Sequence, residues 1–584
     1  MSDFIFSKDS IKKGELTKQL QGIYHQDKPL VSEFHGDWGS LAVSRNIYNG
    51  FQPYETSDHI CIVLGGPVLC FQTNEFLMSD DDTAGTKAVY NKWVGNNIQW
   101  DEDLSGPFVV LVVDKKSRNV VCITDLMSFI PVYIFKDSNN VMISTHVDAL
   151  ARVSGQHDKK DIVSQVDFIL HGVVTFPFTT YTNLKQLGPA SVHTFQCREQ
   201  QLQSEAYWMP KESIQYTSID VAAHDLRNGL QNYIGSITNG MDRIAQFISG
   251  GEDSRLISAL LPKDTQRDAY IFLDGMNREG KIAEKAAVAY GAEFNLATRS
   301  KTFYLDILPE CTDLVGSGSQ YAHVHTYSFH KSCQLAEYSA VFGGLFADAL
   351  LKGARIKKIR GTSRFPFLPQ TKMKDYSMAK EIKSSVFNRG ILLELTKRRQ
   401  QHLEYVKRFR TESAEEWFEL WPSSMNSRIP NLHGNRRLFR SYEPFMAKEV
   451  IKISATVPQS WKLNRRLFHI AAKPYFKQTK WLLHAKGQFP YYPWYVNIIP
   501  QFVNWFIQQV SRIIGITKGN QGPWCDWKDV FESAEWGKLI EEYSGGLRKL
   551  EAAIEVKDAR EFFEKLNNGQ KRNLMQVLYT LQIK

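Results

Sequence analysis

The clearest candidate for chemistry in this sequence is the stretch 249–254, which reads Ser-Gly-Gly-Glu-Asp-Ser and follows a short apolar run. Glycines let backbone N–H groups approach an anion, and the N-terminus of a following helix points its positive dipole at the same place. Ser249 and Ser254 add hydroxyl donors, and Asp253 adds an oxygen ligand that suits Mg²⁺. The pattern predicts that Ser249, Gly250, Gly251, Asp253 and Ser254 bind pyrophosphate and its metal. No Walker motif is present, which argues against an ordinary γ-phosphate transferase.

A sheet must position these residues, and from residue 240 onward short apolar runs alternate with helix-like segments. The apolar runs are 242–248, 269–273 and 340–342, and the helix-like segments are 253–261 and 280–290. This order predicts a parallel sheet covered by helices, which binds ligands at the carboxyl ends of its strands. Gly343 and Gly344 follow the third run, as Gly250 and Gly251 follow the first. We therefore expect Gly343 and Gly344 beside a bound nucleotide or substrate.

The first 210 residues predict a different, β-rich domain. Apolar runs at 60–64, 108–113, 120–124 and 131–135 are separated by Gly, Asn and Asp turn signals, which is typical of packed sheets. The chain turns polar at 211–218, and helical periodicity follows. We predict three regions: a β-rich domain at 1–210, an α/β domain at 211–494 and a helical C-terminal extension at 495–584.

Composition limits the classes of partner and compartment. The chain has 584 residues and a net charge of +9, which is too dilute to indicate a nucleic-acid-binding protein. Seven cysteines without a Cys-x-x-Cys pair argue against a disulfide framework or a zinc ribbon and favour a reducing compartment. The N-terminus lacks the pattern of a secretory signal, and no window is long and apolar enough to span a membrane. We therefore expect a cytoplasmic protein.

One apolar segment near the C-terminus has two interpretations. Between 502 and 514 the apolar residues recur at helical spacing. Docking of this helix onto its own protein is the first interpretation. Contact of the region 491–516 with a membrane surface or a partner is the second.

The stretch 249–254 resembles the pyrophosphate-binding motif of the ATP pyrophosphatases. Its surroundings resemble the asparagine synthetase B type, which includes β-lactam synthetases and lasso-peptide cyclases. The resemblance implies an AMP-forming carboxylate–amine ligase, which activates a carboxylate as an acyl-adenylate, releases pyrophosphate from ATP and lets an amine displace AMP. It implies ATP and Mg²⁺ as cofactors, with Asp253 and Asp348 as metal ligands and Phe272 in the ATP site. It also implies that Lys486 steadies the pyrophosphate and the developing charge.

The N-terminal region resembles the glutaminase half of asparagine synthetase, a class II glutamine amidotransferase, through the strings at 103–114 and 124–133. The resemblance implies a sandwich like that of the Ntn hydrolases. The family's nucleophile is a cysteine exposed after removal of methionine, whereas this chain has Ser2. The family's Asn-Gly-Glu string is replaced by Leu-Gly-Gly-Pro at 64–67. We predict a degenerate domain without glutaminase activity.

The α/β domain departs from the family at its general base. The string 440–445 resembles the family's strand and turn before Pro-Phe, but this chain has Leu345 and Arg440 where β-lactam synthetases hold a base dyad. Tyr442 or Glu443 could act instead, although side chains alternate along a strand and only one of them can face the site. Arg440 could bind a substrate carboxylate or phosphate. Ordinary strand and salt-bridge roles for Arg440, Tyr442 and Glu443 are the alternative.

Together these observations predict an amide-forming synthetase for small-molecule or peptide carboxylates and amines, in natural-product or surface-polysaccharide biosynthesis. The basic run 352–360, directly after Asp348, is expected either to be a solvated face or to cover the triphosphate. An inactive nucleotide- or partner-binding protein and an RNA-modifying ATP pyrophosphatase are the alternatives. No stable nucleic-acid partner is expected, since basic and aromatic residues are not interleaved. A homodimer is an open alternative.

Overall fold

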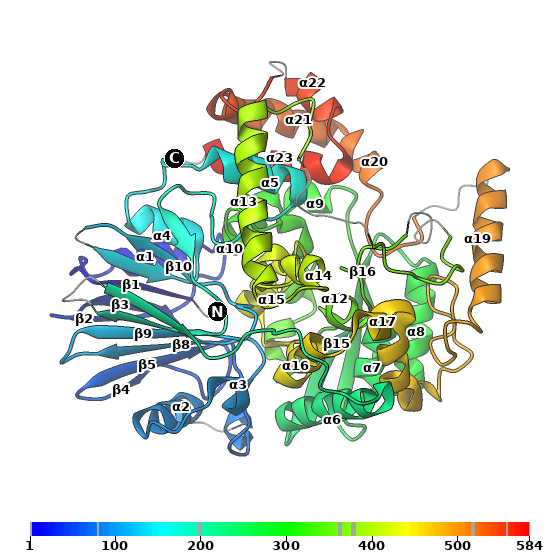
Figure 1. Cartoon of the computed structure of the whole chain (residues 1–584), viewed down its shortest axis with the longest axis horizontal. Helices are drawn as coiled ribbons and strands as arrows, with labels where there is room; N and C mark the ends of the chain where they lie inside the picture. The colour runs from blue at the N-terminus through cyan, green and yellow to red at the C-terminus, as the bar shows by residue number, and fades with distance from the viewer. Residues whose placement is uncertain are drawn as a thin grey trace.

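The N-terminal part folds into two stacked antiparallel sheets of six strands each, at the left of Figure 1. The computed structural model describes residues 3–78, 81–138, 140–196, 201–359, 365–374, 381–514, 520–555 and 559–582. One sheet has the order β12-β10-β11-β1-β3-β2, and the other has the order β14-β13-β9-β8-β5-β4. The strands are β1 (Phe4–Ser7), β2 (Val31–Gly36), β3 (Gly39–Ser44), β4 (Tyr54–Glu55), β5 (His59–Leu64), β8 (Val109–Asp114), β9 (Asn119–Thr124), β10 (Tyr133–Lys136), β11 (Val141–Ser144), β12 (Leu184–Gln186), β13 (Ser191–Gln196) and β14 (Gln201–Ala206).

Alternation of side chains along these strands builds the core between the two sheets. Phe4 and Phe6 of β1 meet Ile62 of β5 and Leu111 of β8, and all four are fully buried. Helices cover the outer face of the first sheet. They are α1 (Glu15–Gln21), α4 (Val147–Val153) and α5 (Ile162–His171). The other elements of the region are β6 (Val68–Leu69), β7 (Leu104–Ser105), α2 (Ala84–Val94) and α3 (Trp100–Asp103).

The second part of the chain is built on a five-stranded sheet with the order β17-β16-β15-β18-β19. All neighbouring pairs in this sheet are parallel. The strands are β15 (Arg243–Phe247), β16 (Gln266–Leu273), β17 (Glu293–Thr298), β18 (Ala340–Phe342) and β19 (Ser441–Tyr442). The chain runs outward from β15 to β17 and then returns to β18 on the other side of β15. The strand order therefore reverses between β15 and β18, where sheets of this kind bind ligands.

Helices cover this sheet and fill the space around it, as Figure 1 shows in green and yellow. They are α6 (Ile219–Thr238), α7 (Glu252–Leu260), α8 (Arg278–Ala289), α9 (Phe303–Asp306), α10 (Leu308–Val315), α11 (Phe329–Ser332), α12 (Ala347–Leu351), α13 (Arg389–Lys407), α14 (Ala414–Phe418), α15 (Pro430–Leu438), α16 (Lys448–Thr456), α17 (Gln459–Lys462) and α18 (Arg466–Ala472). The expected fold class, a β-rich sandwich followed by an α/β domain with a parallel sheet, is confirmed. Strand β17 was not expected from the sequence, because its side chains are only half-buried and its composition is mixed.

The last helices of the chain do not stand apart from the rest. They are α20 (Trp527–Phe531), α21 (Ala534–Tyr543), α22 (Ala559–Glu564) and α23 (Asn568–Gln582). Leu574 and Leu578 of α23 share one hydrophobic core with Phe168 of α5 and Leu308 of α10. Helix α19 (Ile498–Ile513) differs from these, because Figure 1 shows it at the margin of the molecule farthest from the sandwich. No helix in the described ranges has the length and apolarity needed to cross a membrane.

Buried charges join the two parts of the molecule. The Asp3 carboxylate, one residue before β1, accepts hydrogen bonds from Arg436 at 3.0 Å and from Arg437 at 2.7 and 2.8 Å. Both arginines lie on α15, and all three side chains are at most 2% exposed. Burial opposes ionisation of Asp3, but the two guanidinium groups outweigh it and hold the pKa of Asp3 far below its usual range. The start of the sandwich is therefore fixed to the α/β part by a paired, desolvated carboxylate.

Candidate functional site

Both glycine pairs lie at the carboxyl ends of the two strands that flank the reversal of strand order. β15 and β18 pair in parallel with Gln246 opposite Phe342, so the turns that follow the two strands lie side by side. Gly250 and Gly251 lead from β15 into α7, and Gly343 and Gly344 lead from β18 towards α12. A Cβ on Gly344 would lie 3.4 Å from the Cβ of Asp253. The first and second glycine-rich turns are thus in direct contact.

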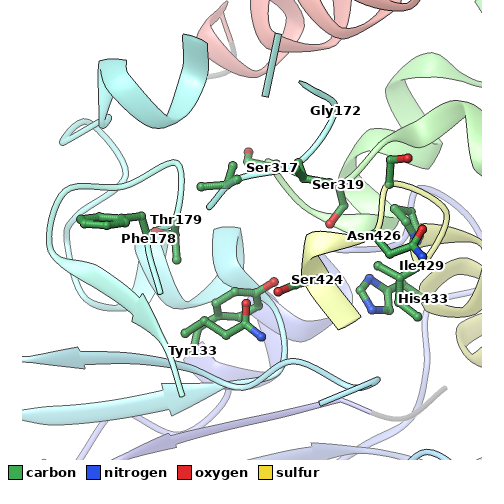
Figure 2. Close-up of a pocket in the computed structure, with 16 residues that line it drawn as sticks. Tyr133, Gly172, Phe178, Thr179, Ser317, Ser319, Ser424, Asn426, Ile429 and His433 are labelled. Carbon is green, nitrogen blue, oxygen red and sulfur yellow. The ribbon is translucent and has the colours of Figure 1, made fainter. Parts of the chain in front are cut away.

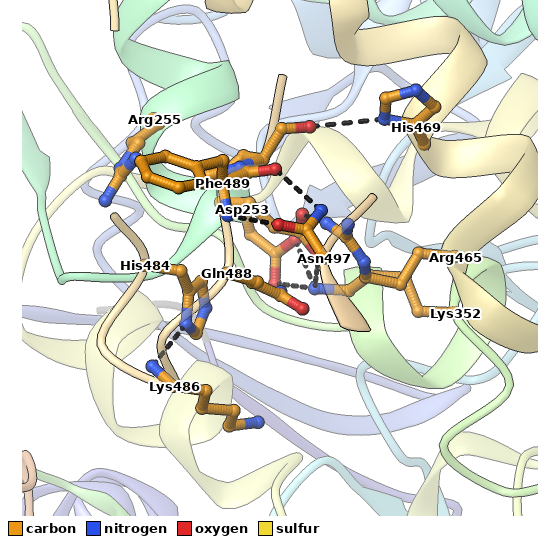
Figure 3. Close-up of polar contacts among 12 residues, drawn as sticks. Asp253, Arg255, Lys352, Arg465, His469, His484, Lys486, Gln488, Phe489 and Asn497 are labelled. Atoms are coloured by element: carbon orange, nitrogen blue, oxygen red, sulfur yellow. Dashed lines mark hydrogen bonds and ion pairs between the residues drawn. The ribbon is translucent and has the colours of Figure 1, made fainter. Parts of the chain in front are cut away.

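Asp253 and Asp348 converge on one cation, and that cation is the side chain of Lys352. The Lys352 Nζ lies 2.6 and 2.8 Å from the two carboxylate oxygens of Asp253 and 2.5 Å from Asp348 Oδ1. Figure 3 shows the Lys352 ammonium pointing at Asp253. Lys352 lies one helical turn after Asp348. The segment that follows Gly343 and Gly344 therefore supplies both the Asp348 carboxylate and the ammonium that pairs with it.

Further charges surround this pair. Glu252 Oε1 lies 3.4 Å from the Lys352 Nζ, and the other Glu252 oxygen is bound by Arg465. Burial raises the pKa of Asp253 to about 7 despite the nearby ammonium of Lys352, and the charges of Asp348 and Glu252 add to the increase. Burial also opposes ionisation of Asp348, but there Lys352 outweighs it and holds the pKa well below its usual range. The site is therefore a compact group of three carboxylates around one buried ammonium.

The backbone N–H groups of the first glycine-rich turn, residues 249–251, already donate hydrogen bonds to groups of the protein. The Ser249 N–H donates to Ser254 Oγ at 3.0 Å, and the Gly251 N–H donates to Ser249 Oγ at 3.1 Å. The Gly250 N–H donates to the Glu279 carboxylate at 2.8 Å, and burial raises the pKa of that carboxyl. A carboxyl group of the protein itself thus occupies one amide of the turn, and binding of pyrophosphate there stays a prediction.

The loop that carries Lys486 is fixed to the same turn. The Ala485 N–H donates to the Gly250 carbonyl at 3.2 Å. Arg255, fully buried on α7, donates to that carbonyl and to the carbonyls of Leu482 and Leu483. The Lys486 side chain is exposed, and its charge helps to lower the pKa of Asp348. Lys486 therefore lies within electrostatic reach of Asp348, and Figure 3 shows its ammonium pointing away from Asp253.

Two further candidate catalytic residues, Tyr442 at the end of β19 and Glu443 directly after it, have different surroundings. Glu443 Oε2 accepts a hydrogen bond from the Leu345 N–H at 2.8 Å, and a Cβ on Gly343 would lie 2.2 Å from Glu443 Oε1. Burial raises the pKa of Glu443 to about 8. Tyr442 is buried and packs edge-on against Tyr48 of the sandwich. Of the two alternatives, Glu443 is the residue that faces the second glycine-rich string.

Arg440 lies in the interface between the two parts of the molecule. Its guanidinium donates to the carbonyl of Ile47 at 2.8 Å, to Asn49 Oδ1 at 3.1 Å and to the carbonyl of Tyr338 at 3.1 Å. These contacts match the structural role that the sequence left as the alternative for Arg440, and binding of a substrate carboxylate or phosphate stays a prediction. The donors that such a bidentate contact needs are already used to hold the sandwich in place.

Phe272 lies on β16 beside the first glycine-rich turn. Its ring stacks on Phe329 with centroids 4.8 Å apart and lies 5.7 Å from the ring of Phe247, which ends β15. A role for Phe272 in binding ATP stays a prediction.

A cavity opens in front of the two aspartates. Its volume is about 230 Å³, and its most basic lining residues are Arg355 and Arg428. Arg355 is paired with Glu419 at 2.9 Å, whereas the half-exposed Arg428 lies 3.7 Å from Asp348 Oδ2. The remaining lining residues are Asp253, Gly344, Leu345, Phe346, Asp348, Ala349, Ala354, Asn426 and Ser427. Two arginines facing two aspartates suit a ligand that carries both anionic groups and a cation.

Comparison with known proteins adds information on the sandwich. Residues 41–208 match the family model described as a glutamine amidotransferase domain. The N-terminal part of the chain is a glutamine amidotransferase domain. No curated protein matches the chain.

Two solved structures are similar to parts of the molecule. One is glutamine phosphoribosylpyrophosphate amidotransferase from B. subtilis complexed with ADP and GMP. It is 8% identical, with 42% of this chain and 60% of that chain covered and a TM-score of 0.23. This chain therefore spans less than two thirds of that protein. The other is described as the allosteric regulatory enzyme of purine biosynthesis. It is 9% identical, with 50% and 80% covered and a TM-score of 0.22.

Residues 64–67, which take the place of the Asn-Gly-Glu string, form a closely packed turn in the amidotransferase domain. A Cβ on Gly65 would lie 2.3 Å from the carbonyl oxygen of Pro107, and one on Gly66 would lie 2.3 Å from the ring of Tyr48. Both glycines have positive φ. Ser2, the residue in place of the expected nucleophile, lies outside the described residues.

Figure 2 shows a small cavity between the amidotransferase domain and the α/β part. Tyr133, Phe178 and Thr179 line it from one side, and Ser317, Asn426 and His433 line it from the other. Its volume is about 30 Å³, which holds on the order of one or two water molecules and no glutamine. Asn426 also lines the larger cavity beside Asp348, so the 424–430 turn separates the two.

Sequence reasoning missed three contributors to the site. It assigned Lys352 to a basic run, although the spacing of four residues from Asp348 on a helix was a usable signal. Glu279 carries no sequence signal for its contact with Gly250, because 29 residues separate the two positions. Arg428 comes from the long segment between β18 and β19 that had no readable pattern.

Proposed function

We propose that the chain is an ATP-dependent synthetase that adenylates a substrate carboxylate, releases pyrophosphate and transfers the acyl group to an amine or to ammonia. The observation that carries the proposal is the meeting of Asp253 and Asp348 on one cation at the point where the strand order reverses. A sheet end with two carboxylates, an amide-rich turn and a lysine loop is what binding of a metal-bound triphosphate requires.

The two aspartates fit a metal ion, because an ammonium already stands between them in the same role. Asp253 and Asp348 would hold Mg²⁺ once Lys352 has moved aside, and their oxygens are the ligands that this ion prefers. When bound, the ion would neutralise phosphate charge and orient the triphosphate.

The chain's own groups would bind and stabilise the leaving pyrophosphate. The amides of Gly250 and Gly251 and the hydroxyls of Ser249 and Ser254 would donate to it in place of their present internal partners. Lys486, on a loop fixed to Gly250, would face the negative charge that develops as the α-phosphate bond breaks. Arg428 would hold the carboxylate substrate in the cavity beside Asp348.

Glu443 is our candidate for the base that removes a proton from the attacking amine. Its pKa of about 8 lies close to neutral pH, which is favourable for proton transfer. Its contact with the Leu345 amide holds it under the second glycine-rich string.

We propose further that the amidotransferase domain is not a glutaminase. The packed turn at 64–67, which takes the place of the family's Asn-Gly-Glu string, supports this proposal. The nucleophile would then be free ammonia or the amino group of a second substrate, as in natural-product or surface-polysaccharide assembly. Release of glutamate from glutamine by the purified protein would refute this part of the proposal.

Exchange of labelled pyrophosphate into ATP tests the synthetase proposal. Purified protein with ATP, Mg²⁺ and a panel of carboxylic acids should show exchange with at least one acid, and Asp253→Asn and Asp348→Asn should abolish it. Asp242→Asn is the matched control, because Asp242 is exposed just before β15. The proposal fails if no acid supports exchange while Asp253→Asn binds ATP as tightly as the parent protein.

One observation favours the alternative of an inactive nucleotide-binding protein. Lys352 fills the cation position, and Glu279 occupies the Gly250 amide. Under this alternative ATP binds without exchange, and neither carboxylic acids nor amines change its affinity.

A further inference from the structure

Helix α19 contacts the rest of the protein through its polar face, and its apolar face is exposed to solvent. Ile499, Phe506, Ile507 and Ile513 recur at helical spacing and are 72, 54, 55 and 84% exposed. Phe502 and Val503 belong to the same face and are also exposed. A helix that docked onto its own protein through its apolar stripe would bury these side chains.

The polar face of α19 contacts the protein instead. Asn504 Oδ1 accepts from Arg278 at 3.0 Å, and Asn504 Nδ2 donates to the Lys486 carbonyl at 3.4 Å. Gln501 Nε2 donates to Gln488 Oε1 at 2.9 Å. Trp505 lies at the border of the two faces and packs on Phe365 and Phe367. These contacts hold the helix while leaving its apolar face open.

The charges that flank α19 in the sequence indicate what covers this face. From Val450 to Cys525 the sequence has ten Lys and Arg residues and no Asp or Glu, and three of the ten, Lys452, Lys462 and Arg465, are paired with carboxylates from other parts of the chain. Arg466, Lys473, Lys477 and Lys480 of this basic segment are exposed. Trp481 and Tyr495, which precede the helix, are 67 and 61% exposed. Exposed aromatic and aliphatic side chains next to a purely basic segment match the interface of an anionic bilayer.

A second copy of the chain fits less well. A two-fold interface brings the same patch of each copy together, so the basic segment would face itself. We propose that the exposed face of α19, formed by Ile499, Phe502, Val503, Phe506, Ile507 and Ile513, docks the protein onto a membrane surface rich in anionic lipid. The helix lies in the plane of the interface, since no described helix can span a bilayer. This inference does not rest on the proposed synthetase activity.

A membrane docked on this face would lie next to the loop that carries Lys486. A Cβ on Gly487 would lie 2.7 Å from the Cβ of Asn504, so the loop and the helix are packed together. This consequence, unlike the docking itself, rests on the proposed function: a synthetase whose lysine loop packs on the docked helix would meet its substrates at the membrane surface.

Flotation of the full chain with lipid vesicles tests the proposal. The protein should float with vesicles of equal parts phosphatidylcholine and phosphatidylglycerol, and less with phosphatidylcholine alone or in high salt. Ile507→Glu should reduce the bound fraction by roughly tenfold or more, because a charge then enters the apolar face. Gln508→Glu is the matched control, since it adds the same charge at an exposed position on the opposite side of the helix, and it should retain most of the binding.

Two outcomes would overturn the proposal. One is a parent protein that stays unbound with the anionic vesicles. The other is a dimer in analytical ultracentrifugation that Ile507→Glu dissociates while vesicle binding is unchanged, which would assign the face to a second copy. Pyrophosphate exchange by Ile507→Glu in the absence of vesicles should match that of the parent, so that failure of docking and failure of the synthetase proposal remain distinguishable.

Discussion

At the scale of single residues, Lys352 determines how the two aspartates behave before a nucleotide arrives. Its ammonium lies within 2.8 Å of both carboxylates and competes directly with any divalent ion for them. Lys352→Met should therefore let the nucleotide-free protein bind Mn²⁺ at least roughly tenfold more tightly than the parent does. Electron paramagnetic resonance of free Mn²⁺ measures this without any catalytic step.

Lys358→Met provides the control for that prediction. Lys358 belongs to the same basic run, but its Nζ donates to the Gly353 carbonyl at 2.7 Å. Its loss should leave Mn²⁺ binding as it is in the parent. Equal Mn²⁺ affinity in the parent protein and in Lys352→Met would show that the ammonium does not compete at the two aspartates.

Glu443 should make stability depend on pH with a defined sign. Its folded-state pKa of about 8 lies above the ordinary value of 4.5, so the folded protein keeps a proton that the unfolded chain releases in this window. The free energy of unfolding should fall as the pH rises from 4.5 to 8, by at most about 4 to 5 kcal/mol from this group. Glu443→Gln keeps an acceptor for the Leu345 amide and cannot ionise, so the variant should lack this fall.

Urea denaturation across this pH range compares the two proteins. The exposed Glu404 supplies the control, because Glu404→Gln should leave the pH profile of the parent unchanged. Parallel profiles for the parent and Glu443→Gln would mean that burial does not raise the pKa of Glu443.

Residue types explain which of these groups the sequence could predict. Asp253, the serines and the glycine pair form one contiguous string whose chemistry is local, and the string lies where the pattern placed it. The partners of Glu279 and Arg440 lie far away in the sequence, as does Asp253 for Lys352, whereas the pairing of Lys352 with Asp348 is local. A charged side chain looks the same in the sequence whether it faces solvent or a buried carboxylate. For this reason the sequence left both a substrate contact and a structural role open for Arg440.

At the scale of elements, a side chain at one position of the second glycine-rich turn would displace a neighbour, whereas a side chain at the next position would fit. A Cβ at residue 343 would meet Glu443 Oε1 at 2.2 Å, whereas a Cβ at residue 344 would meet its nearest neighbour at 3.4 Å. Gly343→Ala should therefore lower the free energy of unfolding by about 1 to 3 kcal/mol and displace Glu443. Gly344→Ala should stay within about 1 kcal/mol of the parent. Urea denaturation measures both, and equal losses in the two variants would contradict the assigned packing.

Helix α19 shows what periodicity can and cannot predict about an element. The spacing of its apolar residues indicated a helix with one apolar face, and a helix is present. The direction of that face was not contained in the pattern, because amide side chains can hold a helix against a protein as Asn504 and Gln501 do here. Only the contacts of the opposite face revealed that the apolar side is open.

At the scale of the whole molecule, the amidotransferase domain and the α/β part behave as one unit, because charges are buried between them. Asp3 precedes the first strand, and Arg436 and Arg437 come from a helix more than 400 residues later. The sequence predicted the two folds from their separate patterns. The sequence could not predict the ion pairs that join the two parts, since neither Asp3 nor the two arginines stand out in composition or spacing.

Asp3→Asn should destabilise the entire molecule by about 3 to 5 kcal/mol, because it leaves two buried guanidinium groups without a counter-charge. Asp9→Asn, at an exposed position just after β1, should have an effect below about 0.5 kcal/mol. The pKa of Asp3 is depressed in the folded state, so its contribution is complete above the unfolded value of 3.8 and is lost as the pH falls below it. The difference between parent and Asp3→Asn in chemical denaturation should therefore be constant near neutral pH and shrink under strong acid. A variant as stable as the parent at neutral pH would show that the junction does not hold the two parts together.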